Sequence, residues 1–361
     1  MSSPLTQPAP RAGQTRASAP VRLGAISYLN VAPVYDWLTS RPAEALGPVT
    51  LVDGVPAQMN RALEAGEIDI SNVSSFAFGA HARAWALAPG LSVAAYGRVD
   101  SVLLFSWQAD WRDLSGRSIA LTDHSATSIE LTKLLAERRY GASPRYTTMA
   151  PNLDAMLAQH DAALLIGDIA LREGYLRREI AGRGRPHVFD LAREWQAWTD
   201  LPFVFAVWAA RHDRAEAVRA AGVVPLLRES TARGLADLPR LAREAAARLD
   251  LPVGLCADYL RLLDYELSAR DLRGLRRFLE LAVPGFRWED VRLLEDGAPT
   301  PSPSPARRER GAALPSSPTH ESSRSSASPS PTNRSSRSSA SPSPAARGRG
   351  PGGGGHHTIR K

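Results

Sequence analysis

The stretch DLPFVFAVWAARHD, residues 200–213, begins like a turn, continues through eight apolar residues and ends in charged ones. A continuous apolar run of this kind is typical of a strand that is buried on both faces of a sheet. Two roles fit it: a crossover that returns the chain from a second lobe to a first one, or a buried strand within a single domain. A second apolar run, residues 99–107, presents the same choice earlier in the chain.

Short apolar runs alternate with amphipathic segments from Val21 onward, which is typical of an α/β protein with largely parallel sheets. Strands are expected at residues 22–27, 49–54, 68–73, 91–99, 101–107, 118–122, near 145, 162–167 and 187–191. Residues 213–281 are expected to be almost entirely helical. We therefore predict two α/β lobes with a ligand cleft between them. Residues 21–99 and 206–296 would form the first lobe, and residues 100–205 the second.

The two ends of the 361-residue chain differ in composition from this body. Residues 297–361 consist mainly of Pro, Ser, Arg and Gly, and the decapeptide SSRSSASPSP occurs at 322–331 and again at 335–344. A segment with so few apolar residues cannot bury enough surface to offset its chain entropy. We therefore expect a disordered C-terminal tail at 297–361 and a disordered N-terminal extension at 1–20.

Charge is distributed unevenly along the chain, whose net charge is +7. The tail carries ten Arg or Lys residues against two Glu, whereas residues 21–296 hold 32 basic and 35 acidic residues. Because the basic excess lies in the extensions, we expect the folded body not to bind nucleic acid. The single cysteine, Cys256, excludes disulfides within the chain and a Cys-based metal site.

No apolar run approaches the length of about eighteen residues that a transmembrane helix requires, so no transmembrane segment is expected. The first twenty residues lack the apolar region of a secretory signal. The sequence therefore predicts a cytoplasmic protein, and it leaves open whether an obligate protein partner exists.

Six segments, in order, resemble the signature segments of the chorismate dehydratases of the futalosine route to menaquinone. They are AISYLNVAPVY, GEIDISNVSSFAF, VDSVLLFS, SATSIELTKLL, AALLIGDIAL and TDLPFVFAVW, and the likeness extends from about Arg22 to Phe286. The resemblance implies a periplasmic-binding-protein-like fold of type II. It also implies conversion of chorismate to 3-[(1-carboxyvinyl)oxy]benzoate and water, with no cofactor and no metal, and with the substrate's own enolpyruvyl carboxylate as the base.

Two positions depart from the family pattern. Asp200 stands where relatives usually carry Gly, and Ala126 where they often carry Arg. The first would alter the geometry of the crossover, and the second would remove a basic group near the ligand.

Polar residues follow the first and third expected strands, where carboxyl strand ends bring ligand-binding side chains together. Asn30 has the alternative of an ordinary helix N-cap, but the matched YLN motif assigns it a catalytic contact with the reacting part of chorismate. Ser27 precedes it and is expected to bind substrate. Ser74 and Ser75 either cap the next helix or contact the ligand.

Ser101 opens the first crossover run and is expected to face the cleft as a catalytic hydrogen-bond or proton-relay partner, with a buried strand serine as the alternative. No His or acidic residue is spaced to make it a nucleophile. His124, which precedes Ser125 in the chain, is given no catalytic part.

Ser125, Thr127 and Ser128 surround the start of an amphipathic helix. One of them caps the helix, and the others are expected to bind a substrate carboxylate, because a helix N-terminus favours anions. Gly167 and Asp168 form another strand-end turn that is expected to bind substrate. Gly allows close backbone approach there, and Asp168 either orients a donor or caps the following helix.

Two other functions remain open from the sequence. The enzyme 1,4-dihydroxy-6-naphthoate synthase of the same pathway shares the fold, but its N-terminal signature is of an SPCPNDT kind, whereas this chain has SYLN. A non-catalytic cytoplasmic solute-binding or sensor protein would bind chorismate or a relative without turnover.

Overall fold

The computed structural model describes residues 19–180 and 182–294, all of which belong to one compact unit. The predicted N-terminal extension, apart from its last two residues, and the predicted tail at 297–361 lie outside the described residues. Within the described part of the chain, no helix has the length and apolar character needed to cross a bilayer.

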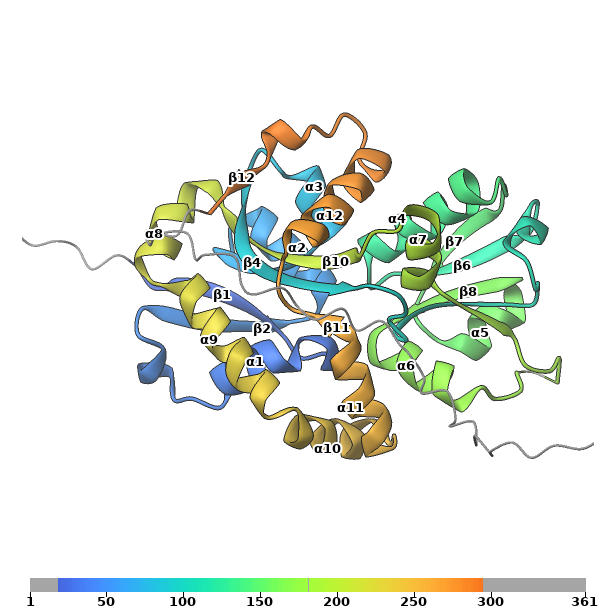
Figure 1. The fold of residues 1–361 in the computed structure, drawn as a ribbon, viewed down its shortest axis with the longest axis horizontal. Helices are drawn as coiled ribbons and strands as arrows, with labels where there is room; N and C mark the ends of the chain where they lie inside the picture. Colours follow the sequence, from blue (N-terminus) through green and yellow to red (C-terminus); the bar gives the residue numbers. More distant parts are fainter. Residues whose placement is uncertain (1–18, 181, 295–361) are drawn as a thin grey trace, which may run out of the picture. The chain divides into compact units, whose positions relative to one another are not determined.

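The first sheet has seven strands in the order β11-β4-β10-β3-β1-β2, with β12 paired to β4 (Figure 1). Its strands are β1 (Val21–Ile26), β2 (Val49–Gly54), β3 (Ile70–Ser74), β4 (Trp85–Ala95), β10 (Phe203–Arg211), β11 (Leu263–Asp264) and β12 (Arg292–Leu293). The second sheet has five strands in the order β7-β6-β8-β5-β9. They are β5 (Val102–Ser106), β6 (Ser118–Thr122), β7 (Arg145–Met149), β8 (Ala162–Ile166) and β9 (His187–Asp190).

Strand β10 shows which of the two roles predicted for the apolar run at residues 200–213 is correct. It follows the second sheet in the chain and lies between β3 and β4 in the first sheet, with only Ala206 and Arg211 less than fully buried. The run is thus both the return to the first sheet and a strand covered on both faces.

The expectation of largely parallel sheets was wrong for the strands that carry the crossings. β10 runs antiparallel to β3 and β4, and β5 runs antiparallel to β8 and β9. The reason is geometric: a strand that arrives directly from the other lobe enters its sheet at the facing edge. Strands β1, β3, β6 and β8 run toward that edge, so an arriving strand must run the opposite way.

Helices fill the remaining connections. They are α1 (Ala32–Thr39), α2 (Pro56–Ala65), α3 (Ser75–Ala80), α4 (Ala126–Leu134), α5 (Leu153–Gln159), α6 (Gly167–Leu176), α7 (Leu191–Thr199), α8 (Ala215–Ala220), α9 (Val223–Ala236), α10 (Leu238–Leu249), α11 (Val253–Leu262) and α12 (Ala269–Ala282). A π-helical turn extends α4 to Arg139. The predicted helical region at 213–281 is confirmed, apart from the short strand β11; α5 and α7 were not predicted.

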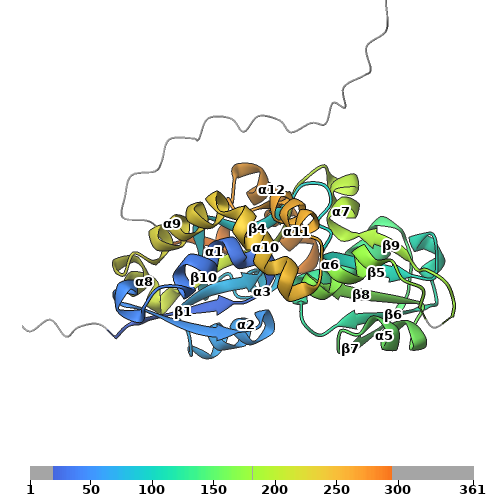
Figure 2. The same cartoon turned by 90° about the horizontal axis from the view of Figure 1, so that it is seen from below.

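The C-terminal helices hold the first lobe together and reach toward the second. α9 and α10 pack against α1, and α11 packs against α10 (Figures 1 and 2). α12 packs on β10 and α3 of the first lobe and also on α4 of the second. At this junction Phe203, Phe278 and Trp195 meet edge to face, with ring centroids 4.9 to 6.2 Å apart. The apolar contacts therefore continue from one sheet to the other.

Both crossovers contain an aspartate in the left-handed region of backbone conformation, Asp100 with φ 60° and Asp200 with φ 53°. Asp200 ends α7 there, which is the conformation that glycine adopts most easily. Its carboxylate accepts a hydrogen bond from the Tyr96 hydroxyl at 2.7 Å, so the two crossovers are joined. Asp200, in place of the family's glycine, thus keeps the left-handed turn and adds a hydrogen bond to Tyr96.

The lobe limits at 21–99, 100–205 and 206–296 stay a prediction.

A Gly274→Ala variant is expected to be destabilised by about 1–3 kcal/mol, as overpacked sites are. A Cβ on Gly274 would lie 2.1 Å from the backbone oxygen of Pro202, just before β10, so α12 or the crossover would have to shift. Urea unfolding measures this change. Gly254→Ala in α11 is the control, because nothing lies within 4 Å of its added carbon; a similar loss in both variants would contradict the argument.

Candidate functional site

A cavity lies between the two sheets and is lined by residues of both lobes. The polar lining residues of the first lobe are Tyr28, Asn30, Asn60, Asn72 and Ser74. Those of the second are Ser101, His124, Ser125, Ser128 and Gly167. Apolar side chains, among them Val93, Val99, Val102, Ile166, Phe205 and Leu263, complete the wall. The cavity thus combines polar groups with an apolar surface, as small-ligand sites commonly do.

Besides the short helix α3, three longer helices begin at this cavity, because parallel strands of each sheet end there. α2 starts beside it at Pro56, α4 follows its cap Ser125, and α6 starts at Gly167. The Ser125 side chain accepts the backbone N–H of Ser128 at 3.2 Å. The positive ends of these helix dipoles point toward the cavity and favour a negatively charged ligand.

Ser101 lies at the end of the first crossover, immediately before β5, and is 3% exposed. Its hydroxyl oxygen accepts a hydrogen bond of 2.9 Å from the hydroxyl of Tyr259 in α11. Burial raises the pKa of Tyr259, which therefore remains a protonated donor. Since one acceptor site of Ser101 is occupied by Tyr259, the Ser101 proton is free to be donated into the cavity.

Asn30 lies in a short 3-10 turn, Leu29–Val31, that leads from β1 into α1. Its Oδ1 is buried and accepts no hydrogen bond from the described residues. The N-cap alternative does not hold, since Val31 precedes α1 and Tyr28 precedes the turn. Asn30 therefore presents an acceptor to the cavity.

Ser74 has the capping role that was its alternative, and it also lines the cavity. Its hydroxyl accepts the N–H of Ala77 at 3.2 Å and contacts the Asn60 amide at 3.3 Å. Asn60 in turn accepts the N–H of Ser74 at 3.2 Å. This pair fixes the end of β3 against α2.

Four residues with a predicted substrate contact do not line the cavity. Ser27 is exposed. The Ser75 hydroxyl donates to the Val204 carbonyl at 2.7 Å. Thr127 accepts the N–H of Phe76 at 3.0 Å, which joins α4 to α3. These contacts serve the packing of the lobes.

Asp168 is the fourth, and it joins α6 to the first lobe. Its carboxylate accepts the N–H of Leu29 at 3.1 Å and pairs with Arg248 of α10 at 2.9 Å. Asp168 does not cap α6, because Ile166 is its N-cap and no side chain caps it; its predicted role in orienting a donor stays a prediction. Gly167 has φ 65°, and its α-carbon faces the Tyr28 ring, which a Cβ would approach to 3.4 Å. This close approach across the lobes favours glycine.

Sequence reasoning missed Tyr259 and Asn72. Tyr259 lies in a helix 158 positions after Ser101, and no local pattern connects the two. Asn72 had a signal: it precedes Ser74 by two residues in β3, and alternate residues of a strand share a face.

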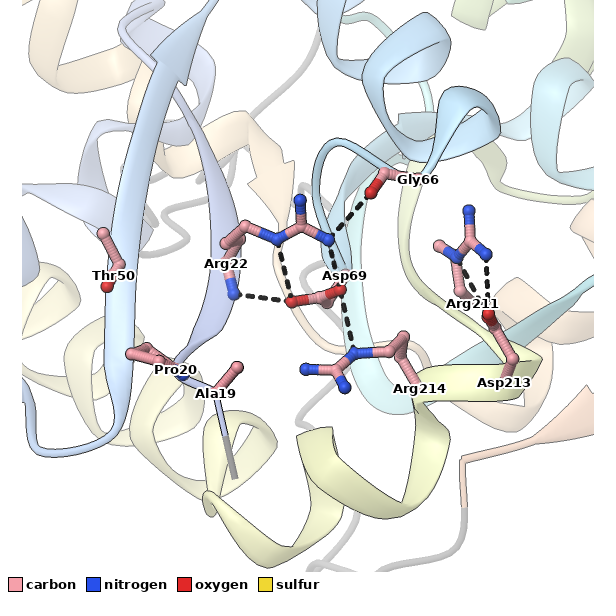
Figure 3. Close-up of a pocket in the computed structure, with 9 residues that line it drawn as sticks. All are labelled: Ala19, Pro20, Arg22, Thr50, Gly66, Asp69, Arg211, Asp213 and Arg214. Atoms are coloured by element: carbon pink, nitrogen blue, oxygen red, sulfur yellow. Dashed lines mark hydrogen bonds and ion pairs between the residues drawn. The ribbon is translucent and has the colours of Figure 1, made fainter. Parts of the chain in front are cut away.

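A larger opening, of about 620 Å³, lies at the other edge of the first sheet, where β1 and β2 begin (Figure 3). Its centre is Asp69, which is fully buried and pairs with Arg22 at 2.8 Å and Arg214 at 3.0 Å. Arg211 pairs with Asp213 beside it at 2.6 Å. Each of the three arginines therefore already has a carboxylate partner, so we assign this opening a structural role.

Burial raises the pKa of Asp69, but hydrogen bonds from Arg22 and Arg214 outweigh this effect and hold the pKa of Asp69 below its usual value.

The candidate site is therefore the cavity between the sheets. Among the described residues, no group of three or more His, Cys, Asp or Glu side chains is placed to hold a metal ion.

Solved structures with the same architecture define the class of fold. A protein from Archaeoglobus fulgidus matches with TM-score 0.56 and 17% identity, covering 74% of this chain and 98% of that one. The periplasmic aliphatic sulphonate binding protein of Escherichia coli matches with TM-score 0.53 and 19% identity, covering 73% and 87%. The fold is therefore that of the periplasmic binding proteins, as predicted.

The family follows from sequence. Residues 21–284 match the family model described as menaquinone biosynthesis. The chain is also 38% identical over 275 residues to the chorismate dehydratase of Thermus thermophilus, covering 73% of this chain and 96% of the relative. The chain belongs to this menaquinone biosynthesis family.

Proposed function

We propose that the protein is a chorismate dehydratase, a carbon–oxygen lyase that converts chorismate to 3-[(1-carboxyvinyl)oxy]benzoate and water. The relative from Thermus thermophilus has this name and is similar over nearly its whole length. The observation that carries the proposal is the Ser101–Tyr259 pair at the wall of a cavity that also holds the unpartnered Asn30 oxygen. The cytoplasmic location stays a prediction.

Chorismate is a small dianion, and the cavity suits such a ligand without a strong cation. None of the described residues that line the cavity is Arg, Lys, Asp or Glu. The starts of α4 and α6 supply N–H donors for the carboxylates, and Ser128, whose oxygen accepts the Ser125 O–H at 3.0 Å, adds an O–H donor. The absence of lining carboxylates also avoids repulsion of the substrate.

The reaction removes the C4 hydroxyl and the C3 proton, and the ring becomes aromatic. The C4 hydroxyl is the only O–H donor of the dianion, and it is oriented by Asn30 Oδ1, which accepts no hydrogen bond from the described residues. Ser101 then donates its proton to the departing C4 oxygen, which leaves as water, while the hydrogen bond from the protonated Tyr259 stabilises the serine oxygen. The resemblance to the chorismate dehydratases implies that the C3 proton passes to the enolpyruvyl carboxylate of the substrate, and a described lining without Asp or Glu agrees with this. The proton then returns from this carboxyl group to Ser101.

A Tyr259→Phe variant is expected to lower kcat about tenfold while KM changes little, because the hydrogen bond that orients Ser101 is lost but Ser101 remains. Steady-state assays at several chorismate concentrations separate the two constants. A Tyr35→Phe variant is the control, since Tyr35 is an equally buried hydroxyl that bonds to Trp208 and Gly24. Equal losses of kcat in both variants would assign Tyr259 a general structural role.

The proposed function is tested by incubating the purified protein with chorismate and analysing the mixture by chromatography and mass spectrometry. A product that is lighter than chorismate by one water and carries an aromatic ring supports the dehydratase. Binding of chorismate without turnover would indicate a solute-binding or sensor protein, and lack of binding would overturn the assignment of the substrate.

A further inference from the structure

Asn72 is a buried amide with an unused donor. The residue is 5% exposed and lies in the middle of β3. Its Nδ2 donates to no described residue, although the side chain lines the cavity. An unsatisfied buried donor destabilises a folded protein, so its retention at a cavity wall calls for a ligand that satisfies it.

The backbone of β3 fixes where this donor lies. Asn72 is paired opposite Trp208 in the neighbouring strand β10. The adjacent Ser71 hydroxyl bonds to the Gly24 carbonyl of β1, while Ser74, two residues after Asn72, lines the cavity with it. A side chain on a central strand is held more precisely than one on a loop.

The bound substrate supplies the matching acceptor. At neutral pH each carboxylate of chorismate only accepts hydrogen bonds, and none of the described residues at the cavity wall is an Asp or Glu that would compete for the amide. A hydrogen bond from an amide to a carboxylate is charge-assisted and therefore stronger than one between neutral groups.

We propose that Asn72 is a substrate-positioning residue whose side-chain amide donates a hydrogen bond to a carboxylate of bound chorismate. The inference rests on the proposed dehydration of chorismate and adds a ligand contact from the first lobe. It assigns the carboxylate contacts to both lobes, since Asn72 on β3 lines the same cavity as Ser125 and Ser128 at the start of α4.

An Asn72→Leu variant tests this role, because leucine has a similar size and no polar atoms. We expect KM to rise about tenfold, or about 1.4 kcal/mol, while kcat changes much less. We also expect the melting temperature to stay the same or rise, since the unsatisfied donor is gone. A purely structural asparagine would give the opposite pattern, a lower melting temperature with an unchanged KM.

Ser92→Ala is the matched control. Ser92 lies on β4, is fully buried and has a hydroxyl without a hydrogen-bond partner among the described residues, but it does not line the cavity. Its KM should match that of the wild type. If Asn72→Leu does not fold, Asn72→Ala gives the same test with a smaller side chain.

The outcomes separate the two proposals. If the wild type does not turn over chorismate, the proposed function fails. If the wild type is active and the Asn72 variant that folds has a KM within about twofold of the wild-type KM, the proposed role of Asn72 is overturned. The proposed function then still stands.

Discussion

A Ser101→Ala variant is expected to dehydrate chorismate at least about a hundredfold more slowly than the wild type, the range found when a positioned proton donor is removed. Ser101 is the hydroxyl at the cavity wall whose oxygen is held by Tyr259 at 2.9 Å. Without it the departing C4 hydroxyl receives no proton from the protein. The variant should have a lower kcat and a nearly unchanged KM, because the carboxylate contacts at α4 and α6 remain.

Single-turnover measurement of the aromatic product gives the rate of this step directly. Ser106→Ala is the control, since Ser106 is fully buried at the other end of β5, where its hydroxyl accepts the N–H of Gln108 at 2.9 Å. That variant should lose some stability but keep its rate. Wild-type kcat in Ser101→Ala would remove Ser101 from the mechanism, and an equal rate loss in Ser106→Ala would indicate a packing effect.

Replacing Asp69 by alanine is expected to destabilise the protein by about 3 kcal/mol at pH 7, within the range for removing one partner of a buried ion pair. Asp69 is fully buried and accepts hydrogen bonds from the backbone and side chain of Arg22 and from the side chain of Arg214 (Figure 3). The estimate is at the low end of that range because the side chains of Arg22 and Arg214 are 41% and 30% exposed and keep part of their hydration.

The pH dependence of this loss has a definite sign. The folded pKa of Asp69 is lowered, so its stabilisation is complete above the unfolded pKa of about 3.9 and disappears as the pH falls through the folded pKa. The difference in unfolding free energy between wild type and Asp69→Ala should therefore be largest at neutral pH and shrink below about pH 4. Urea unfolding at pH 7 and at acid pH measures it.

Asp213→Ala is the control for this prediction. Its pair with Arg211 lies beside Asp69, but the Asp213 side chain is 62% exposed, so the loss should stay under about 1 kcal/mol. An Asp69→Ala variant as stable as Asp213→Ala would show that the buried network does not stabilise the first sheet. Turnover per folded molecule should be unchanged in both, since this edge of the sheet lies opposite the cavity.

Capping serines show how much of the site could be predicted from sequence. Ser125 was identified from three hydroxyls at the start of an amphipathic segment, and the structure has it as the cap of α4 at the cavity wall. Capping is local, because the side chain and the N–H that it accepts are only a few residues apart. Thr127 shows the limit: its hydroxyl faces α3 instead of the cavity, because the packing between the lobes decides which side of α4 faces the ligand.

Apart from α5 and α7, the sequence by itself determined the kinds of elements and their order, because apolar periodicity and helix caps act over a few residues. It determined that the run at residues 203–210 is buried apart from Ala206, and it determined the family. Only the tertiary structure decided that β10 runs antiparallel between β3 and β4, that Asn72 has an unused donor, and that Tyr259 holds Ser101. Each of these depends on groups that are distant in the chain and become neighbours only when the two sheets and the C-terminal helices pack.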